Sequence, residues 1–343
     1  MSGTNALKLN SQEEFLSEVT KSVNEKINNF SSDSLKEMTF NHFQTPGKMI
    51  RPKLVFGLAK ALGVDILKVL GWAVSCELLH NASLIHDDLQ DGDKTRRGRP
   101  TTWYKYGNNH AINIGDFLLI IAPLGIFDSN LSCDLKLLLN KNYSEMASNI
   151  VIGQSEEFVL NQLNDLPNLR GDYFKCVSLK TAALFSYLAK GVGISGEFSK
   201  LDFLSDIFNE IGLIFQMQDD ILDLFGDKKR DSVGCDIQEG KVSFLIVKHF
   251  EINPSDMDWM IAILKKERSK TTIEDIEKIR MAFISSNTLN ECLQEIFEKI
   301  KTLMAKDLDQ VQGLVKQMIE EILNPIYHLM EEKHEEAHLS SST

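Results

Sequence analysis

The sequence has few features of a secreted or membrane-spanning protein. Its five cysteines are an odd number, lie far apart and form no CxxC pair, which is typical of reduced residues in a cytosolic protein. The N-terminus has no basic segment leading into an apolar one, so no secretory signal is evident. The most apolar window, Phe117 to Phe127, contains Pro123 and is too short to span a bilayer. We therefore expect a cytoplasmic protein with no stable membrane span.

Positive charge is also scarce. The 343 residues include 37 Lys and Arg against 49 Asp and Glu, which gives a net charge of −12 at pH 7. Nucleic acids and anionic membrane surfaces are bound through basic surfaces, so neither is expected as a partner. An anionic substrate would have to be bound by local arginines and by metal ions.

Turn-forming residues are few as well. The chain has 7 prolines and 20 glycines, with no regular Asn-Gly or Asp-Gly hairpin signals between alternating strands, which leaves little room for a sheet. Apolar residues at helical spacing are frequent instead. Ser11 with Glu14 resembles a capping box, and it precedes an apolar face made of Leu16, Val19, Val23 and Ile27. The sequence therefore predicts an all-α fold.

Aspartates cluster at the end of a predicted long helix from about Asp65 to Asp91. Asp87, Asp88 and Asp91 follow an apolar helix face. Asp87 and Asp91 lie one turn apart, where like charges repel each other, so the cluster favours a bound cation. Carboxylate oxygens suit Mg²⁺, which commonly takes one or two carboxylates, waters and substrate phosphate oxygens.

A solvated helix end explains one such cluster more often than a metal site does. The same carboxylate spacing recurs, however, at Asp219, Asp220 and Asp223, after a second apolar run from Leu201 to Phe225. Two chance copies at the ends of two core helices are much less expected than one. The paired clusters therefore predict a metal site.

Basic residues occur after the first cluster and in an earlier loop. Arg96 and Arg97 closely follow the first one and carry planar groups that bind phosphate. Lys48 and Arg51 precede a helix predicted from about Lys53 to Leu62, whose first turn suits Pro52. They make a plausible anion site, although a solvated loop is the more ordinary interpretation.

The motifs DDLQD and RRGRPT, with FQMQDDILD downstream, resemble those of the trans-isoprenyl diphosphate synthase (polyprenyl synthetase) family. The resemblance runs from about Gly47 to Lys248, and the segment from Cys235 to Phe244 is closest to geranylgeranyl diphosphate synthases of eukaryotic type. It implies a single-domain helical bundle of the isoprenoid synthase type over residues 1–343, with both aspartate motifs at the mouth of a central apolar cavity. It also implies a homodimer, and we expect residues 1–10 and 331–343 to be flexible ends.

The implied activity is the Mg²⁺-dependent, head-to-tail condensation of isopentenyl diphosphate with an allylic diphosphate. No side-chain base is evident, and the family assigns the final deprotonation to the released pyrophosphate. The residues implied as metal-binding are Asp87, Asp88, Asp91, Asp219, Asp220 and Asp223.

The family binds isopentenyl diphosphate through the motif GGKRxRP. Gly47, Lys48 and Arg51 match this motif, whereas Pro46 and Met49 replace its first glycine and its middle arginine. These departures put the shape of the loop in doubt more than its charge.

Other matching positions complete the implied site. His80 and Arg97 join the isopentenyl diphosphate pocket, although a lone histidine on an apolar face is usually a core residue. Arg96, Lys180 and Lys241 would stabilise the departing pyrophosphate, while Thr181 and Gln216 match family positions at the reacting end of the allylic substrate.

Two further segments differ from the family. Ser232 stands where many members have a lysine, so one phosphate contact is expected to be absent. Gln154 and Glu157 resemble the family's GQxxD with Glu in place of Asp, and both a role near the metals and a solvated pair remain open.

Product length follows from the direction of the helix that ends at Asp87. Farnesyl diphosphate synthases of the family carry large aromatics four and five residues before this aspartate, where the present chain has Ser83 and Ala82. Leu79 is the first bulky residue further down, which predicts geranylgeranyl diphosphate as the main product. The alternatives are a farnesyl or longer-chain synthase, a terpene cyclase and a non-catalytic synthase subunit.

Overall fold

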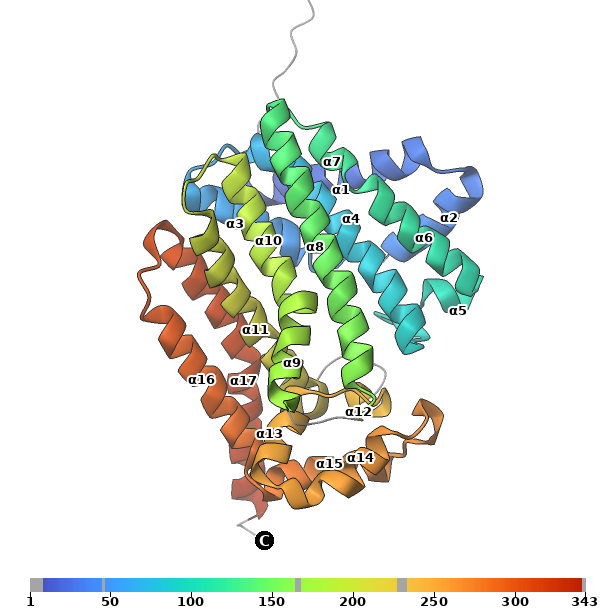
Figure 1. The fold of residues 1–343 in the computed structure, drawn as a ribbon, viewed down its shortest axis with the longest axis vertical. Helices are drawn as coiled ribbons and strands as arrows, with labels where there is room; N and C mark the ends of the chain where they lie inside the picture. Colours follow the sequence, from blue (N-terminus) through green and yellow to red (C-terminus); the bar gives the residue numbers. More distant parts are fainter. Residues whose placement is uncertain (1–8, 45–46, 164–167, 227–232, 341–343) are drawn as a thin grey trace, which may run out of the picture. The chain divides into compact units, whose positions relative to one another are not determined.

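The computed structural model describes residues 9–44, 47–163, 168–226 and 233–340 (Figure 1). Within these ranges the regular structure is helical apart from one antiparallel hairpin of two-residue strands, β1 (Thr95–Arg96) and β2 (Arg99–Pro100). The predicted all-α class is therefore confirmed.

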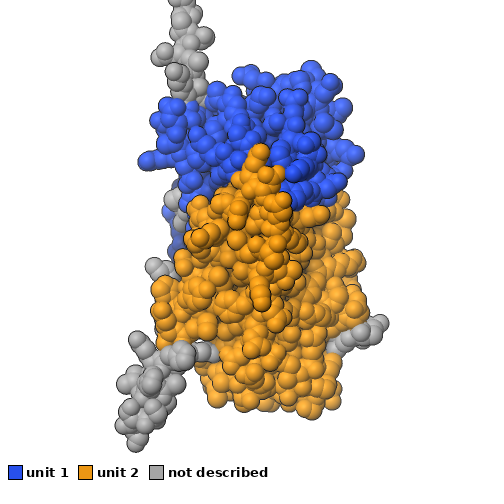
Figure 2. All heavy atoms as spheres, turned by 90° about the vertical axis from the view of Figure 1, so that its left-hand side faces the viewer, with its two compact units in different colours: residues 1–147, 187–205 blue, residues 148–186, 206–343 orange. Residues whose placement is uncertain are grey.

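The chain divides into two compact units, which Figure 2 shows in different colours. Unit 1 comprises residues 1–147 and 187–205, and unit 2 comprises residues 148–186 and 206–343. The boundaries fall inside three helices, α8 (Cys133–Leu160), α10 (Ala183–Ser195) and α11 (Leu201–Phe225).

The other helices each lie within one unit. Those of unit 1 are α1 (Gln12–Phe30), α2 (Asp33–Phe43), α3 (Ile50–Leu62), α4 (Ile66–Asp91), α5 (Thr102–Tyr106), α6 (Asn108–Ile121) and α7 (Leu124–Phe127). Those of unit 2 are α9 (Leu169–Val177), η1 (Ser178–Ala182), α12 (Cys235–Gln238), α13 (Phe244–Ile252), η2 (Pro254–Asp256), α14 (Met257–Leu264), η3 (Arg268–Lys270), α15 (Ile273–Ser285), α16 (Thr288–Met304), η4 (Asp309–Val311) and α17 (Gln312–Ser340).

The predicted capping box is present at the start of α1, where the Ser11 and Glu14 side chains each accept a backbone N–H of the other. The buried face of this helix differs slightly from the prediction, because Phe15 is fully buried and Leu16 is only half-buried. The bulkier side chain therefore takes the core position.

Helix α4 is the core helix of unit 1, packed against α1, α3, α6 and α7. It begins at an Asp65 cap, whose side chain accepts the Leu67 N–H, and ends at Gly92 in a left-handed conformation. A Cβ added at Gly71 would lie 2.2 Å from the carbonyl oxygen of Gly125, so α4 and α7 cross in backbone contact. This close packing fixes the first turns of α4, and the first aspartate motif lies at the other end of the helix.

In unit 2, a single π-helical turn, η1, joins α9 to α10 and carries Lys180 and Thr181. A Cβ at Gly153 of α8 would lie 2.6 Å from the Lys180 nitrogen, and one at Gly212 of α11 would lie 2.5 Å from the Ala182 Cα. The π turn is therefore held between two helices at backbone distance. Such turns are frequent at functional sites.

The apolar stretch around Phe117 to Phe127 is longer in the structure than the window seen in the sequence. Helices α6 and α7 together form a 20-residue stretch, Asn108–Phe127, that is long and apolar enough to cross a membrane. A core helix of a globular protein meets the same criterion, and 44% of this stretch is buried within the protein.

Candidate active site

The first aspartate motif is tied to the hairpin that follows it. Asp88 is 1% exposed, and its Oδ1 accepts hydrogen bonds from Arg96 Nε at 2.7 Å and Arg96 Nη2 at 2.6 Å. Burial raises the pKa of Asp88 to about 6, an effect that the Arg96 charge opposes. Arg96, predicted to stabilise departing pyrophosphate, therefore holds a motif aspartate in this structure.

The hairpin turn places the second arginine. Arg97 and Gly98 occupy the turn with φ values of 53° and 74°, the left-handed pair that suits a two-residue hairpin. A Cβ added at Gly47 would lie 3.0 Å from Arg97 Nη1. The Arg97 guanidinium therefore packs against Gly47, which explains why a glycine suits this position of the predicted phosphate loop.

Two predicted ligands of isopentenyl diphosphate in unit 1 are half-buried residues that each contain a fully buried polar atom. Arg51 Nε and His80 Nδ1 are both inaccessible to solvent and have no hydrogen-bond partner among the residues that the structure describes. Burial lowers the pKa of Arg51 to about 10 and that of His80 well below its usual range, which nearby arginines reinforce for His80. Buried polar atoms without partners are rare and costly, so these two indicate a polar ligand.

The remaining residues of the predicted phosphate loop are less constrained. Lys48 is exposed, and Met49 takes a left-handed φ of 51° directly before α3. Helix α3 starts three residues earlier than the predicted start near Lys53, at Ile50. Pro46 lies outside the described residues.

Sequence reasoning missed a buried polar network next to His80. Asn81 Nδ2 donates to Glu77 Oε1 at 3.0 Å, and Asn81 Oδ1 accepts from His42 Nε2 at 3.1 Å. Burial lowers the pKa of His42 to about 4 and raises that of Glu77, where Arg51 opposes the rise. Glu77 lies one helical turn before His80 and Asn81, so the i, i+3, i+4 spacing of polar residues in an apolar helix was the available signal.

The residues predicted to limit chain length lie on α4. Leu79 is 1% exposed and Ala82 is 0% exposed, whereas Ser83 is half-buried and donates its hydroxyl to the His80 carbonyl at 2.8 Å. Leu79 and Ala82 are thus interior positions, as a role in product length requires.

The second aspartate motif, at the end of α11 in unit 2, is hydrogen-bonded to several surrounding elements. Asp220 Oδ1 accepts from Gln216 Nε2, and its Oδ2 accepts from the Tyr173 hydroxyl and the Phe244 N–H, each at 2.7 Å. Asp223 Oδ2 accepts the Asp236 N–H at 3.0 Å. Both aspartates therefore anchor other elements of unit 2. Burial raises the pKa of Asp220 to about 6, against the effect of its hydrogen bonds.

Two predicted catalytic lysines form ion pairs. Lys180 Nζ lies 2.6 Å from Glu157 Oε2, so Glu157 in the altered GQxxD motif is the ion-pair partner of Lys180. Lys241 Nζ lies 2.6 Å from Glu239 Oε2. Gln154 is buried, and neither of its amide atoms has a hydrogen-bond partner within the described ranges. Ser232 lies outside those ranges.

The structure thus groups the predicted residues into two sets. Unit 1 contains the first motif with Lys48, Arg51, His80, Arg96 and Arg97, and unit 2 contains the second motif with Lys180, Thr181, Gln216 and Lys241. That the two motifs share one cavity stays a prediction.

The donor chemistry of both motifs suits Mg²⁺. In the part of the chain that the structure describes, no three or more His, Cys, Asp or Glu side chains form a group that could hold a metal ion. Mg²⁺ usually keeps waters and binds one or two carboxylates together with substrate phosphates, so it needs no complete protein cage. Carboxylates beside buried cationic groups fit an ion that is bound together with a diphosphate.

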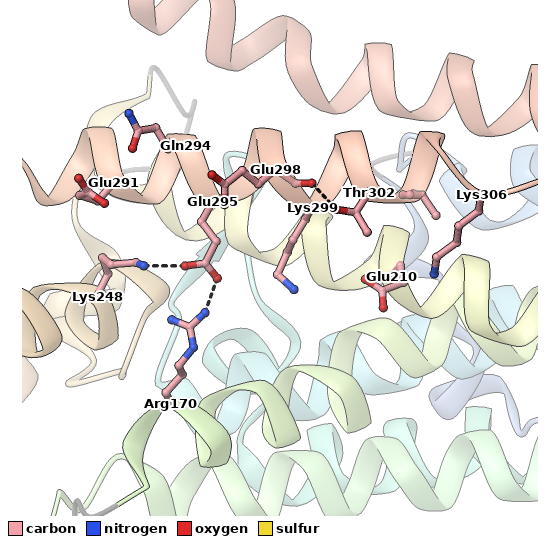
Figure 3. Close-up of a pocket in the computed structure, with 11 residues that line it drawn as sticks. Arg170, Glu210, Lys248, Glu291, Gln294, Glu295, Glu298, Lys299, Thr302 and Lys306 are labelled. Atoms are coloured by element: carbon pink, nitrogen blue, oxygen red, sulfur yellow. Dashed lines mark hydrogen bonds and ion pairs between the residues drawn. The ribbon is translucent and has the colours of Figure 1, made fainter.

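A pocket of about 580 Å³ lies in unit 2 among other residues (Figure 3). In it, the Glu295 carboxylate contacts both Arg170 and Lys248. Its lining is Arg170, Glu210, Lys248, Glu291, Gln294, Glu295, Glu298, Lys299, Thr302, Leu303 and Lys306. The lining has equal numbers of cationic and anionic side chains, and it includes none of the predicted site residues.

Known proteins resemble the chain over most of its length. A family model described as polyprenyl synthetase matches residues 32–283. The geranylgeranyl diphosphate synthase of Saccharolobus solfataricus is 30% identical over 273 residues, covering 77% of this chain and 81% of that protein. The short chain isoprenyl diphosphate synthase of Methanothermobacter thermautotrophicus is 32% identical over 260 residues, covering 74% and 79%. The crystal structure of geranylgeranyl pyrophosphate synthetase from Pyrococcus horikoshii matches with a TM-score of 0.74 at 28% identity, covering 90% of this chain and 98% of that one.

Proposed function

The chain belongs to the polyprenyl synthetase family, and from this premise we propose that it condenses isopentenyl diphosphate with an allylic diphosphate to give mainly geranylgeranyl diphosphate. Membership makes it a trans-prenyltransferase. The product is supported by the geranylgeranyl diphosphate synthase among its relatives and by the small residues Ala82 and Ser83 on α4.

The observation that carries the proposal is the pair of unpartnered polar atoms on Arg51 and His80. A buried N–H of a guanidinium costs free energy unless an acceptor meets it, and isopentenyl diphosphate supplies both acceptor oxygens and negative charge. Lys48 and Arg97 add two cations for the same diphosphate. Holding it in this way would fix the double bond of isopentenyl diphosphate toward the allylic carbon.

The residues of unit 2 act at the reacting end of the allylic substrate. The bond between its first carbon and the diphosphate oxygen breaks, the double bond of isopentenyl diphosphate attacks that carbon, and the released pyrophosphate takes the proton that is lost. Lys180 and Lys241, with Arg96 of unit 1, would stabilise the charge on the pyrophosphate, while Thr181 and Gln216 would direct oxygen dipoles toward the developing cation.

The metal-binding role falls on the two aspartate motifs. Asp87 and Asp91 of the first motif and Asp219 of the second would bind Mg²⁺ directly. Asp88 in the first motif, and Asp220 and Asp223 in the second, would support them. When bound, Mg²⁺ neutralises the charge that develops on the departing pyrophosphate.

The remaining features of the proposal concern the whole chain. We place it in the cytoplasm as a single catalytic domain and a homodimer. Exposed apolar side chains in unit 1 support the dimer, since Ile112 of α6 is 44% exposed, Ile120 is 75% exposed and Leu137 of α8 is 69% exposed. Light scattering of the wild type and of Ile120→Lys would measure the oligomeric state, and a wild-type monomer would refute the dimer.

The activity is tested by incubating the purified protein with labelled isopentenyl diphosphate, each allylic primer and Mg²⁺, and then sizing the products. We expect a labelled C20 diphosphate. A terpene cyclase would instead convert the allylic diphosphate alone into a hydrocarbon, and a non-catalytic subunit would give no product without a partner. In the same assay, we expect Asp219→Ala to lower turnover by orders of magnitude. Its matched control is Asp206→Ala, which we expect to retain full activity because Asp206 is an exposed aspartate of the same helix.

A further inference from the structure

The Asp220 carboxylate is the centre of a buried hydrogen-bond network in unit 2. Asp220 is 5% exposed and Tyr173 is 3% exposed, and the Tyr173 hydroxyl donates to Asp220 Oδ2 at 2.7 Å. The Phe244 N–H donates to the same oxygen, and Gln216 Nε2 donates to Oδ1, both at 2.7 Å. The three donors come from α9, α13 and α11, so this one carboxylate joins three helices.

The network also fixes the orientation of the Gln216 amide. Because its nitrogen donates to Asp220, its oxygen faces the other way and accepts the Thr181 hydroxyl hydrogen at 2.7 Å. A flipped amide would set two acceptor oxygens, Gln216 Oε1 and Asp220 Oδ1, against each other. A continuous chain of donors and acceptors therefore links Tyr173, through Asp220 and Gln216, to Thr181.

We propose that Tyr173 is a positioning residue for prenyl transfer, acting through Asp220 to hold Gln216 and Thr181 in place. The inference rests on the proposed function, because Thr181 and Gln216 matter for turnover only if they lie at the reacting end of the allylic substrate. Tyr173 is separated from Thr181 by three successive hydrogen bonds and by two intervening side chains, those of Asp220 and Gln216.

The Tyr173 ring has a separate structural role that a substitution can preserve. It stacks on Phe244 with ring centroids 6.2 Å apart and meets Phe174 edge to face at 5.2 Å. Phenylalanine at position 173 keeps both ring contacts and removes only the hydroxyl. Tyr173→Phe therefore tests the hydrogen bond to Asp220 without opening a cavity in the core.

We expect Tyr173→Phe to lower kcat about 10- to 100-fold, as for the loss of a hydrogen bond to a charged group, with KM for both substrates within about twofold of wild type. The matched control is Tyr143→Phe. Tyr143 is 6% exposed and donates its hydroxyl to the Leu119 carbonyl at 2.9 Å in unit 1, so it also loses one buried hydrogen bond. This control should keep its kcat while its melting temperature changes as much as that of Tyr173→Phe.

A double-mutant cycle separates positioning from a general structural effect. Thr181→Val removes the hydroxyl at the far end of the hydrogen-bond chain. If both residues act through one network, the double variant should lower kcat by much less than the product of the two single effects. Multiplicative effects, or an unchanged kcat in Tyr173→Phe, would overturn the inference while leaving the proposed function intact. A wild-type protein that makes no prenyl diphosphate would refute the proposed function itself.

Discussion

Replacing Ala82 with phenylalanine should shorten the product to farnesyl diphosphate, and replacing Leu79 with alanine should lengthen it. With the diphosphate held at Asp87, the growing tail would run back along α4. Ala82 lies about 7.5 Å and Leu79 about 12 Å below that aspartate, at ~1.5 Å per helical residue. The difference of about 4.5 Å is close to the length of one extended isoprene unit. Each substitution should therefore change the length at which elongation ends by about one isoprene unit.

Ala82 and Leu79 are at most 1% exposed, so the change in stability on substitution shows what surrounds each side chain. If the tail runs past Ala82, the new ring fills space that the product would occupy, and stability is little changed. If Ala82 packs against solid core, overpacking costs about 1–3 kcal/mol. Leu79→Ala likewise costs about 2–5 kcal/mol in a solid core, which lowers the melting temperature by about 3–7 °C in a chain of this length.

The assay combines product sizing with thermal unfolding. Leu78→Ala is the control, since Leu78 is also fully buried on α4 but points about 100° away from Leu79. It should lose stability and keep the wild-type product. If Ala82→Phe and Leu79→Ala both gave the wild-type product and both had a lowered melting temperature, α4 would not set the chain length and the reasoning would fail.

Three other predictions concern the two sites and the core. Asp87→Ala and Asp219→Ala should each lower turnover by orders of magnitude and leave the melting temperature unchanged; near wild-type turnover in excess Mg²⁺ would exclude them as metal ligands. Arg51→Ala and His80→Ala should weaken the binding of isopentenyl diphosphate by about 1.5–3 kcal/mol and that of the allylic primer much less. Equal changes in the Michaelis constants of both substrates would argue against separate pockets. Burial lowers the pKa of His249, so below about pH 6.5 its imidazole stays neutral in the folded protein and gains a proton in the unfolded chain. The free energy of unfolding of the wild type should therefore fall there by up to ~1.4 kcal/mol per pH unit relative to that of His249→Gln. Urea unfolding of both proteins at pH 5.5 and 7.5 measures this, and an equal change in the free energy of unfolding for the wild type and His249→Gln would contradict it.

Local patterns were sufficient to predict the helices that carry the aspartate motifs. The helix expected from about Asp65 to Asp91 is α4 (Ile66–Asp91), and the run from Leu201 to Phe225 is α11. Both follow from apolar periodicity, which depends on residues a few positions apart in the sequence. The hairpin of β1 and β2 and the π turn η1 were not predicted, because a two-residue strand and one extra residue in a helical turn leave no periodic signal.

The helical class, the two aspartate motifs and the family can be recognised from the amino-acid sequence, since each depends on residue types at short, fixed spacing. The contacts that those residues make depend on the folded structure. The contacts of Asp88 with Arg96, of Asp220 with Tyr173 and of Lys180 with Glu157 join residues that are distant in the sequence or belong to different elements. The burial that leaves Arg51 Nε and His80 Nδ1 without a hydrogen-bond partner among the described residues is likewise set by the packing of whole helices, because the solvation of a side chain depends on everything around it and not only on its neighbours in the sequence.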